Sequence, residues 1–365
     1  MVKVEKQLVV KKKKILYIVE AMGGGVFTYI VDMANELVDT YDMYIAYAVR
    51  KQTPQNYKDY FDKKIHLIEV KNFGRAINPT KDIAAFFEIK KIVIEVKPDI
   101  IHLHSSKAGV LGRLAFSGKI PMFYTPHGYS FLMEDYKLAK QRLFKLIELI
   151  CAKRNCMTIS CSLGEHHETL KLTKHATYVN NGINIEELKK IIDKTKKEPH
   201  PFTVYTLGRI CYQKNPTLFN EIAKLLPEAH FVWIGDGELR HELTSKNIEI
   251  TGWTDRSTAI RYAVNADVFL LPSRWEGLPI SLLESMYMKK ICVVSNVIGN
   301  RDVIHNGENG FVCSEIKDYM KAMKIAQNDH DDLKERAYQD TVRVYNTKVM
   351  AKQYSSVYQK VLTNK

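Results

Sequence analysis

Short apolar runs alternate with amphipathic stretches along nearly the whole chain, and this alternation limits the folds that it can adopt. The short runs predict buried strands, and stretches such as residues 26–38, with apolar side chains three or four positions apart, predict helices. Strands that alternate with helices form parallel sheets covered by helices on both faces, so we expect an α/β protein with doubly wound sheets. The predicted strands are residues 15–19, 44–49, 65–70, 100–104, 122–125, 157–160 and 177–179 in the first half, and 202–206, 230–234, 248–250, 268–271 and 291–294 in the second.

The length of 365 residues suffices for two domains, each with its own hydrophobic core. The strand and helix pattern restarts after a highly charged segment, residues 186–199, which predicts a hinge. We therefore expect a first Rossmann-like domain over residues 1–185 and a second over residues 200–345.

Composition narrows the class of protein further. The chain has 45% hydrophobic and 26% charged residues, which is typical of a globular protein in water. It has no apolar run of the roughly 18 to 20 residues that a membrane span needs. Its six cysteines are scattered without a CxxC pair, which favours reduced thiols and a cytoplasmic protein.

The formal net charge is +13, and the excess of lysine and arginine belongs mainly to the first half. Such a charge suits an anionic acceptor, an anionic membrane surface or nucleic acid. Residues 137–154 predict a basic amphipathic helix, which either covers the sheet or lies at a lipid interface. A basic nucleic-acid-binding protein remains a remote alternative, but the chain has no recognised nucleic-acid motif, so we expect no nucleic-acid partner.

The segment 273–286 is the most informative about function. It follows the apolar run 268–271, and Pro279 stands where a helix would begin, because its fixed φ and missing N–H suit that position. The segment therefore predicts a strand, a tight turn and a helix. The free amides and the positive dipole end of such a helix attract phosphate.

Two carboxylates flank this predicted phosphate site. Glu276 precedes the helix and Glu284 lies about two turns along it, which puts them about 12 Å apart. Paired carboxyl groups of glycoside hydrolases lie only about 5 to 9.5 Å apart, so a hydrolytic acid/base pair is disfavoured. The spacing suits the two hydroxyl-bearing ends of one long ligand with a negatively charged middle, and a nucleotide sugar has that shape.

Glu276 and Glu284, with seven residues between them, a preceding Pro-Ser and the intervening Gly277-Leu278-Pro279, resemble the signature of the family 4 retaining glycosyltransferases. The resemblance implies the GT-B fold, in which two Rossmann-like domains face each other across a cleft. It also implies that a last helix, here within residues 346–365, crosses back to pack on the first domain.

The implied activity is retaining transfer of a hexose or N-acetylhexosamine from a nucleotide-diphosphate sugar, expected to be UDP-linked, to a hydroxyl of an acceptor. Two other enzyme classes stay open as alternatives. A GT-B phosphorylase would carry pyridoxal phosphate, and a nucleotide-sugar epimerase would convert the donor without any acceptor.

By the same resemblance, Glu276 contacts the donor sugar and Glu284 the ribose, while Arg209 and Lys214 hold the diphosphate and stabilise its departure. His127, at the end of a first-domain strand, orients the sugar and stabilises the transition state. The expected catalytic residues are thus His127, Arg209, Lys214 and Glu276. The expected donor-binding residues are Gly24, Gly25, Gly208, Arg209, Lys214, Gly235, Trp253, Glu276, Gly277, Leu278, Pro279 and Glu284.

The glycine run 23–25 lies between the first predicted strand and helix, where glycines allow phosphate to approach the backbone. It lacks the G-x-G-x-x-G spacing of a dinucleotide site. The resemblance identifies it as the loop that touches the donor diphosphate from the first domain. His104, Ser105 and Lys107 are the expected contacts to the acceptor.

The acceptor is expected to be a lipid-linked saccharide, as in the assembly of bacterial capsule, exopolysaccharide or O-antigen. The enzyme would then be cytoplasmic and peripheral on the inner face of the plasma membrane. The basic first half and residues 137–154 agree with an anionic surface there.

Neither a metal nor another cofactor is expected. Residues 329–331, Asp-His-Asp, match the DxD motif of metal-dependent GT-A transferases, but they lie in a polar turn before a helix, where capping explains them. GT-B enzymes normally use cations such as Arg209 and Lys214 in place of a metal. The chain departs from the family pattern at residues 298–302, where two adjacent glycines are more usual, and this concerns contacts near the donor phosphate.

Overall fold

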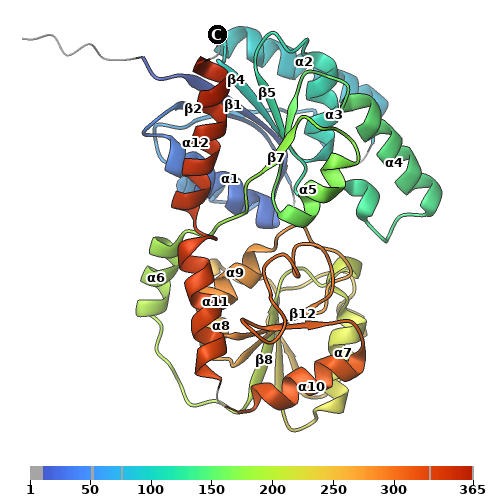
Figure 1. Ribbon diagram of the computed structural model, residues 1–365, viewed down its shortest axis with the longest axis vertical. Coiled ribbons are helices and arrows are strands. Elements are labelled where there is room, and N and C mark those ends of the chain that lie inside the picture. Colours follow the sequence, from blue (N-terminus) through green and yellow to red (C-terminus); the bar gives the residue numbers. More distant parts are fainter. Residues whose placement is uncertain (1–10, 51–52, 75–76, 329, 364–365) are drawn as a thin grey trace, which may run out of the picture.

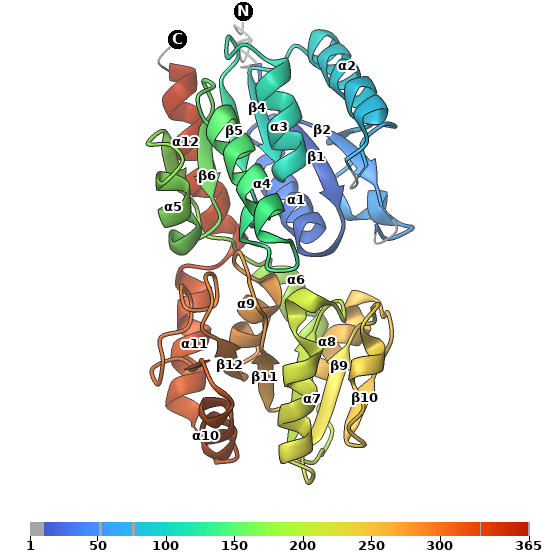
Figure 2. The ribbon, with the colours of Figure 1, turned by 90° about the vertical axis from the view of Figure 1, so that its right-hand side faces the viewer.

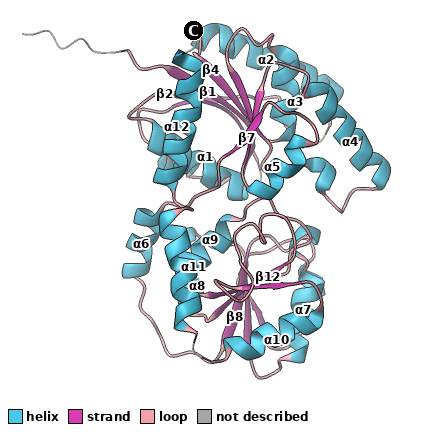
Figure 3. Ribbon diagram, viewed as in Figure 1, coloured by secondary structure: helices cyan, strands magenta, loops and turns pink. Residues whose placement is uncertain are grey.

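The chain forms two α/β domains that are stacked along its long axis (Figure 1). This computed structural model describes residues 11–50, 53–74, 77–328 and 330–363. Each domain has a parallel sheet with helices on both faces, as Figure 3 shows. The predicted α/β fold with two Rossmann-like domains is confirmed.

The first domain contains a seven-stranded sheet in the order β3-β2-β1-β4-β5-β6-β7, and all its pairings are parallel. Its strands are β1 (Lys14–Met22), β2 (Asp42–Val49), β3 (His66–Glu69), β4 (Ile100–His104), β5 (Met122–Thr125), β6 (Met157–Ser160) and β7 (Ala176–Tyr178). Its helices are α1 (Gly24–Leu37), α2 (Pro79–Val96), α3 (Ser106–Ala115), α4 (Leu138–Cys151) and α5 (Leu163–Leu170), with 3₁₀ turns η1 (Tyr57–Tyr60) and η2 (Ser130–Leu132).

The two faces of this sheet are covered by different helices. One core unites α1 and α12 with β1 and β2, while the other unites α2 and α3 with the opposite side chains of the same strands. In Figure 2, α2, α3, α4 and α5 lie together on the side that faces the viewer. The strands are buried on both faces, which is why they read as nearly continuous apolar runs.

The second domain contains a six-stranded parallel sheet in the order β10-β9-β8-β11-β12-β13. The edge strand β13 was not among the predicted strands. The strands are β8 (Thr203–Leu207), β9 (His230–Ile234), β10 (Ile248–Ile250), β11 (Val268–Leu271), β12 (Ile291–Ser295) and β13 (Phe311–Cys313). The helices are α6 (Ile185–Asp193), α7 (Pro216–Leu225), α8 (Arg256–Val264), α9 (Ile280–Tyr287), α10 (Ile316–Ala326) and α11 (Asp331–Arg343), with η3 (Tyr212–Lys214) and η4 (Arg240–Glu242). The last helix, α12 (Thr347–Thr363), belongs to the first domain's core.

Each sheet has a point where the strand order reverses. In the first sheet β1 lies between β2 and β4, and in the second β8 lies between β9 and β11. Open α/β sheets bind ligands beyond the carboxyl ends of the strands at such points. The loops after β1, β4, β8 and β11 are therefore where the fold itself directs the search for a site.

The connection between the domains corrects the predicted hinge. Residues 185–193 form α6, whose apolar side chains pack in the core of the second domain. The high charge of this segment lies on the exposed face of an amphipathic helix, which Asn184 caps by accepting from the amide of Glu187 at 3.1 Å. Residues 194–202 are the part that remains without helix or strand.

The chain crosses between the domains at two adjacent segments. Ile183 and Asn346 form a parallel bridge, and a Cβ at Gly182 would lie 2.4 Å from the carbonyl carbon of Asn346, so only glycine allows this approach. After the second crossing, α12 packs on the first domain beside α1 through side chains such as Tyr354 and Tyr358. The predicted return of the last helix is confirmed.

Candidate active site between the two domains

The turn after β11 places the start of α9 at the switch point of the second sheet. α9 begins at Ile280, directly after Pro279, which occupies the N-cap position. No side chain caps this end, so its amides and positive dipole end are directed at the site. The helix start can accept an anionic group such as a phosphate.

Glu276 in this turn forms an ion pair with Lys214. The Oε1 atom of Glu276 lies 2.7 Å from Nζ of Lys214, and the two side chains are only 7% and 16% exposed. Gln213 donates to the carbonyl of Trp275 at 3.0 Å and lies 3.5 Å from Oε2 of Glu276. Sequence assigned these two charges to different parts of the donor, and the structure brings them into direct contact.

Glycines let the loops after β8 and β9 pass close to each other. A Cβ at Gly235, whose φ is +137°, would lie 2.2 Å from the carbonyl oxygen of Gly208. A Cβ at Gly208 would itself lie 3.3 Å from Cε of Lys214. Arg209 follows Gly208, and its guanidinium lies 3.8 Å from Glu238. Two cations, Arg209 and Lys214, thus lie near the carboxyl end of β8.

Trp253 lies beside this pair of loops. Its neighbour Gly252 forms a bridge with Gly235, and Thr251 accepts a hydrogen bond from the amide of Gly235 at 3.2 Å. The indole is 65% exposed. An exposed aromatic face beside the β8 and β9 loops is open to stacking by a nucleotide base.

Glu284 is buried on α9 and pairs with Arg256 at the start of α8. The distance between Glu284 Oε1 and Arg256 Nη2 is 2.7 Å, and Glu187 lies 3.5 Å from Nε of the same arginine. The negative charge of Glu284 raises the pKa of Arg256, although burial of the guanidinium acts in the opposite direction. Sequence reasoning missed Arg256, because only the tertiary fold brings α8 against α9.

Asp32 of α1 reaches the same charges from the first domain. It is 3% exposed, and its Oδ2 has no hydrogen-bond partner among the described residues. Burial raises the pKa of Asp32 to about 8, and the charges of Arg256, Glu187 and Glu284 act on it as well. An acid inside the apolar stretch 26–38 was the sequence signal that could have singled it out.

The glycine run before α1 leaves open space. Gly24 has φ +58°, and a Cβ on Gly24 or Gly25 would meet no atom within 4 Å. Gly23 occupies the N-cap position without a side-chain hydrogen bond. Like α9, α1 therefore begins with an uncapped, positively polarised end.

His127, at the end of β5, lies against the first domain's core. Its backbone has φ +55°, unusual for a residue with a side chain, and its ring packs edge-on against Tyr29 of α1 at 4.6 Å between centroids. The Nε2 atom of His127 lies 3.1 Å from Nδ1 of His104. Burial lowers the pKa of His127 to about 3, so its imidazole is neutral at physiological pH.

Behind His127, a polar network continues to the C-terminal helix. The His104 ring packs against the His102 ring at 4.1 Å between centroids. His102 shares hydrogen bonds with Tyr358 of α12 at 2.6 Å and with Thr125 at 2.9 Å. Burial lowers the pKa of both His102 and His104 well below its ordinary value.

The three expected acceptor contacts lie at the end of β4 and just after it. His104 is fully buried, and its ring lies within hydrogen-bond distance of His127. Lys107 is engaged with Asp82 and with the carbonyl of Gly74, each at 2.6 Å. Ser105 has φ +75°, and its Oγ is buried without a hydrogen-bond partner in the described part of the chain. His104 and Lys107 thus have partners within the first domain, while the role of all three residues in acceptor binding stays a prediction.

The loops of the two domains meet at Gly277. A Cβ there would lie 3.5 Å from the amide of Gly128 and 3.7 Å from the backbone of His127. Asn181 of the first domain donates to the carbonyl of Leu278 at 2.9 Å. The Glu276 turn and the His127 loop therefore lie face to face across the domain interface.

Gly299, in the segment that departs from the family pattern, packs directly behind the Glu276 turn. A Cβ there would lie 2.0 Å from the carbonyl oxygen of Gly277, and φ is +84°. Asp302 accepts from the amide of Gly164 at 2.8 Å, which ties this loop to the first domain. One glycine is enough for the close approach behind the Glu276 turn.

The DxD-like residues lie far along the chain, before α11. Asp329 is outside the described residues. His330 stands at the N-cap without a side-chain capping bond, and Asp331 is inside the first turn, 3.3 Å from Lys334. The predicted side-chain capping is therefore not seen at His330. Instead, the negative charge of Asp331 in the first turn interacts favourably with the positive end of the helix dipole. Within the described residues, no three His, Cys, Asp or Glu side chains are grouped to hold a metal ion.

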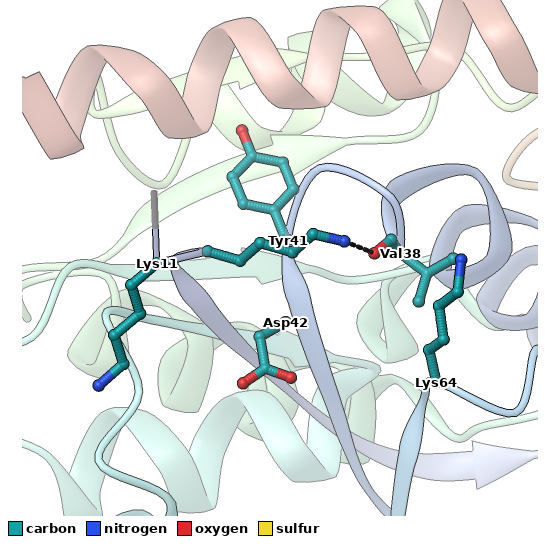
Figure 4. Close-up of a pocket in the computed structure, with 6 residues that line it drawn as sticks. Lys11, Val38, Tyr41, Asp42 and Lys64 are labelled. Carbon is teal, nitrogen blue, oxygen red and sulfur yellow. Dashed lines mark hydrogen bonds between the residues drawn. The ribbon is translucent and has the colours of Figure 1, made fainter. Parts of the chain in front are cut away.

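A small lysine-rich hollow lies elsewhere on the first domain, between the start of β1 and the end of α1 (Figure 4). It is lined by Lys11, Lys12, Val38, Tyr41, Asp42 and Lys64. Lys12 is already bonded to the carbonyl of Val38 at 2.9 Å. This hollow contains none of the predicted site residues.

Two family models match the chain in succession. Residues 23–187 match the Glycosyltransferase Family 4 model, and residues 186–340 match the model for glycosyl transferases group 1. An Escherichia coli relative, UDP-Gal:alpha-D-GlcNAc-diphosphoundecaprenol alpha-1,3-galactosyltransferase, is 32% identical over 74% of this chain and 77% of its own. In Campylobacter jejuni, N,N'-diacetylbacillosaminyl-diphospho-undecaprenol alpha-1,3-N-acetylgalactosaminyltransferase is 26% identical over 94% of this chain and 97% of its own.

Solved structures share the fold over nearly the whole length. The sucrose-phosphate synthase of Thermosynechococcus elongatus has a TM-score of 0.82 at 14% identity and covers 97% of this chain and 100% of its own. Anabaena HepE, solved with UDP and glucose, has a TM-score of 0.75 at 15% identity, with 95% of this chain and 100% of its own covered. With the Glu276 turn, the uncapped helix starts and the two matching models, these similarities show that the chain belongs to the family 4 glycosyltransferases.

Proposed function

We propose that this glycosyltransferase moves a hexose or N-acetylhexosamine from a UDP-linked donor to a hydroxyl of a lipid-linked saccharide during surface polysaccharide assembly. The names of the Escherichia coli and Campylobacter jejuni relatives support a diphosphoundecaprenol-linked acceptor. The Escherichia coli name and the UDP in Anabaena HepE support a uridine donor.

In this proposal the donor diphosphate lies between the uncapped starts of α9 and α1, with Arg209 and Lys214 beside it. Both helix starts offer amides to phosphate oxygens, and the two cations balance the charge that develops on the leaving group. Gly25, which has open space around it, lets the diphosphate approach the backbone of the first domain.

Glu276 and Glu284 contact the sugar and the ribose. Glu276 accepts hydrogen bonds from sugar hydroxyls while Lys214 balances its charge. Glu284 is paired with Arg256 here, and a ribose would share its carboxylate with that arginine. Trp253 stacks on the base.

Transfer retains the anomeric configuration. The acceptor oxygen attacks the anomeric carbon from the side on which UDP leaves. As the new carbon–oxygen bond forms and the bond to the phosphate oxygen breaks, that phosphate oxygen takes the acceptor proton. Lys214 pairs with Glu276, and the low pKa of His127 makes its imidazole a weak base, so the leaving phosphate oxygen is the available base.

His127 serves as a neutral hydrogen-bonding partner of the transferred sugar. Its low pKa means that it contributes no positive charge at physiological pH, and His104 fixes the direction of its ring. Cationic assistance then comes from Arg209 and Lys214, and we propose that the reaction needs no metal.

A lipid-linked acceptor places the enzyme at a bilayer. We propose a cytoplasmic location, peripheral on the inner face of the plasma membrane. No helix in the described ranges has both the length and the apolar character that crossing a membrane requires.

The observation that carries the proposal is the Lys214–Glu276 pair beside the start of α9, facing the His127 loop. The test measures UDP release and product formation from an α-linked UDP-hexose with an undecaprenyl-diphosphate saccharide, with EDTA and with added Mg²⁺. We expect an α-linked product by NMR at equal rates in both conditions. A β-linked product would contradict retention, loss of activity in EDTA would contradict metal independence, and donor turnover without the saccharide would indicate an epimerase or hydrolase.

A further inference from the structure

The outer surface of α4 is unusually apolar for a helix exposed to water. Leu138, Leu143, Leu146 and Ile150 are between 52% and 70% exposed. At 100° per residue they fall within one arc of the helix, whereas its buried side chains are Glu148 and Cys151. The hydrophobic stripe of α4 therefore points away from the core that the helix covers.

A second helix on the same side of the sheet, α2, also has apolar side chains on its exposed face. On α2, Ile83, Phe87 and Ile94 are between 60% and 69% exposed and share one face of the helix. Both α2 and α4 flank α3 on the side of the first sheet that faces the viewer in Figure 2. Nine of the nineteen large hydrophobic side chains that are exposed in the described part of the chain lie on these three helices.

Basic side chains accompany both stripes. Arg142 lies inside the apolar arc of α4, Lys145 lies at one edge of it, and Lys140 lies beyond the other edge. Lys90 and Lys91 flank the stripe of α2. Long basic side chains that surround exposed apolar ones suit the interface of an anionic bilayer, where the apolar groups enter and the cations meet headgroups.

Nearby carboxylates are mostly occupied within the protein. Glu148 is buried and receives Arg113 at 2.7 Å and Tyr124 at 2.9 Å. Asp82 pairs with Lys107 at 2.6 Å, and Glu88 accepts from Asn72 at 2.9 Å. These three acids therefore do little to offset the positive field of the exposed face, whereas Glu95 lies 3.8 Å from Lys91 and offsets that one cation.

The face adjoins the candidate active site along the chain. Only residues 128–137 separate His127 from the start of α4. A bilayer against α4 would thus be connected by residues 128–137 to the loop that, in the proposed function, meets the sugar.

We propose that the outward faces of α2 and α4, which we name the docking face, bind the surface of a bilayer that contains anionic phospholipid. The role of docking rests on the proposed function, since a docked enzyme would present a lipid-linked acceptor to the His127 loop. The assignment of the surface depends only on its exposed apolar side chains and its charge.

The test compares full-length variants in sedimentation with vesicles of phosphatidylglycerol and phosphatidylethanolamine, and with vesicles of phosphatidylcholine. The variants are Leu143→Glu with Leu146→Glu, and Ile83→Glu with Phe87→Glu. The control is Leu170→Glu with Leu225→Glu, which makes the same charge change at exposed leucines of α5 and α7. Stabilisation by UDP in thermal unfolding reports whether each variant is folded with an intact donor site.

The docking face predicts that each test pair lowers the partition coefficient on anionic vesicles at least about tenfold, while the control stays near wild type. Wild-type protein should bind phosphatidylcholine vesicles more weakly than vesicles that contain phosphatidylglycerol. Wild-type protein that ignores anionic vesicles, or test pairs that bind like the control, would overturn the proposal. So would a wild-type dimer that both test pairs dissociate without any effect on vesicles, because the face would then bind a second copy.

The two proposals can fail separately. If UDP stabilises none of the proteins while vesicle binding follows the prediction, the donor assignment is wrong and the docking face is supported. If UDP stabilises all of them and vesicles bind none, the docking face is wrong and the donor site is supported.

Discussion

Replacing Lys214 by Met and Glu276 by Gln, singly and together, separates the structural effect of their ion pair from its role in transfer. Exposed pairs contribute about 0 to 1 kcal/mol, and breaking a buried one costs about 3 to 5 kcal/mol. At 16% and 7% exposure this pair lies between these limits. Lys214→Met should therefore lower the free energy of unfolding by about 2 kcal/mol, since Glu276 keeps only Gln213, at 3.5 Å.

Glu276→Gln should cost less, about 1 kcal/mol, because the longer lysine can turn its ammonium towards water. The double variant contains no unpaired charge, so its stability should return to within about 0.5 kcal/mol of wild type. Urea unfolding measures these values. Lys64→Met, which breaks the exposed pair with Asp39, is the control and should cost no more than roughly 0.5 kcal/mol.

Activity should follow a different pattern. Each single change removes a group that acts on the donor, so kcat for UDP release should fall by roughly 10² to 10³. The double variant should stay as inactive as the worse single variant, although it has regained stability. Recovery of kcat in the double variant, or a Lys214→Met enzyme within tenfold of wild type, would refute the assigned roles.

Three further changes test other parts of the site. Gly299→Ala should lower the free energy of unfolding in urea by about 3 kcal/mol or more, because the new Cβ would lie 2.0 Å from the carbonyl oxygen of Gly277. Gly25→Ala has open space around its Cβ, so it should unfold like wild type but lower kcat/KM for the donor. Equal stability of the two variants would contradict the packing argument. Asp32 has a folded-state pKa of about 8 against an ordinary value of 3.8, so the folded state holds a proton that the unfolded state releases, and stability should decline as pH rises from about 4 to about 8. Thermal unfolding of Asp32→Asn should show a shallower decline, and an unchanged slope would disprove the assignment. Tyr358→Phe removes the 2.6 Å hydrogen bond to His102 and should lower kcat about tenfold with little change in donor KM, while Tyr319→Phe should leave kcat unchanged; equal kcat values in both would show that the network does not orient His127.

Local pattern was enough for most of the fold. Each of the twelve predicted strands is present, because strands buried on both faces leave apolar runs that no helix period imitates. The prediction differed from the structure where tertiary contacts determine whether a segment is helical. Residues 185–193 looked like a linker because their charges dominate the composition, yet Ile185 and Leu188 face the second domain's core.

The site shows the same division. Glu276, Gly277 and Pro279 could be found because a strand, a turn and a helix leave a contiguous record in the sequence. Arg256 could not, since its contact with Glu284 depends on how α8 packs against α9. His104 alternates with His102 on one strand, and only the packing of α12 shows that both are buried.

In the proposed function, the diphosphate of a uridine donor lies between the starts of α9 and α1. A crystal structure of the protein with UDP would locate this diphosphate. We expect phosphate oxygens within hydrogen-bond distance of the first amides of α9 and of Arg209 or Lys214, with the ribose hydroxyls on Glu284. UDP bound outside the domain interface, or a diphosphate that touches neither helix start, would contradict this expectation.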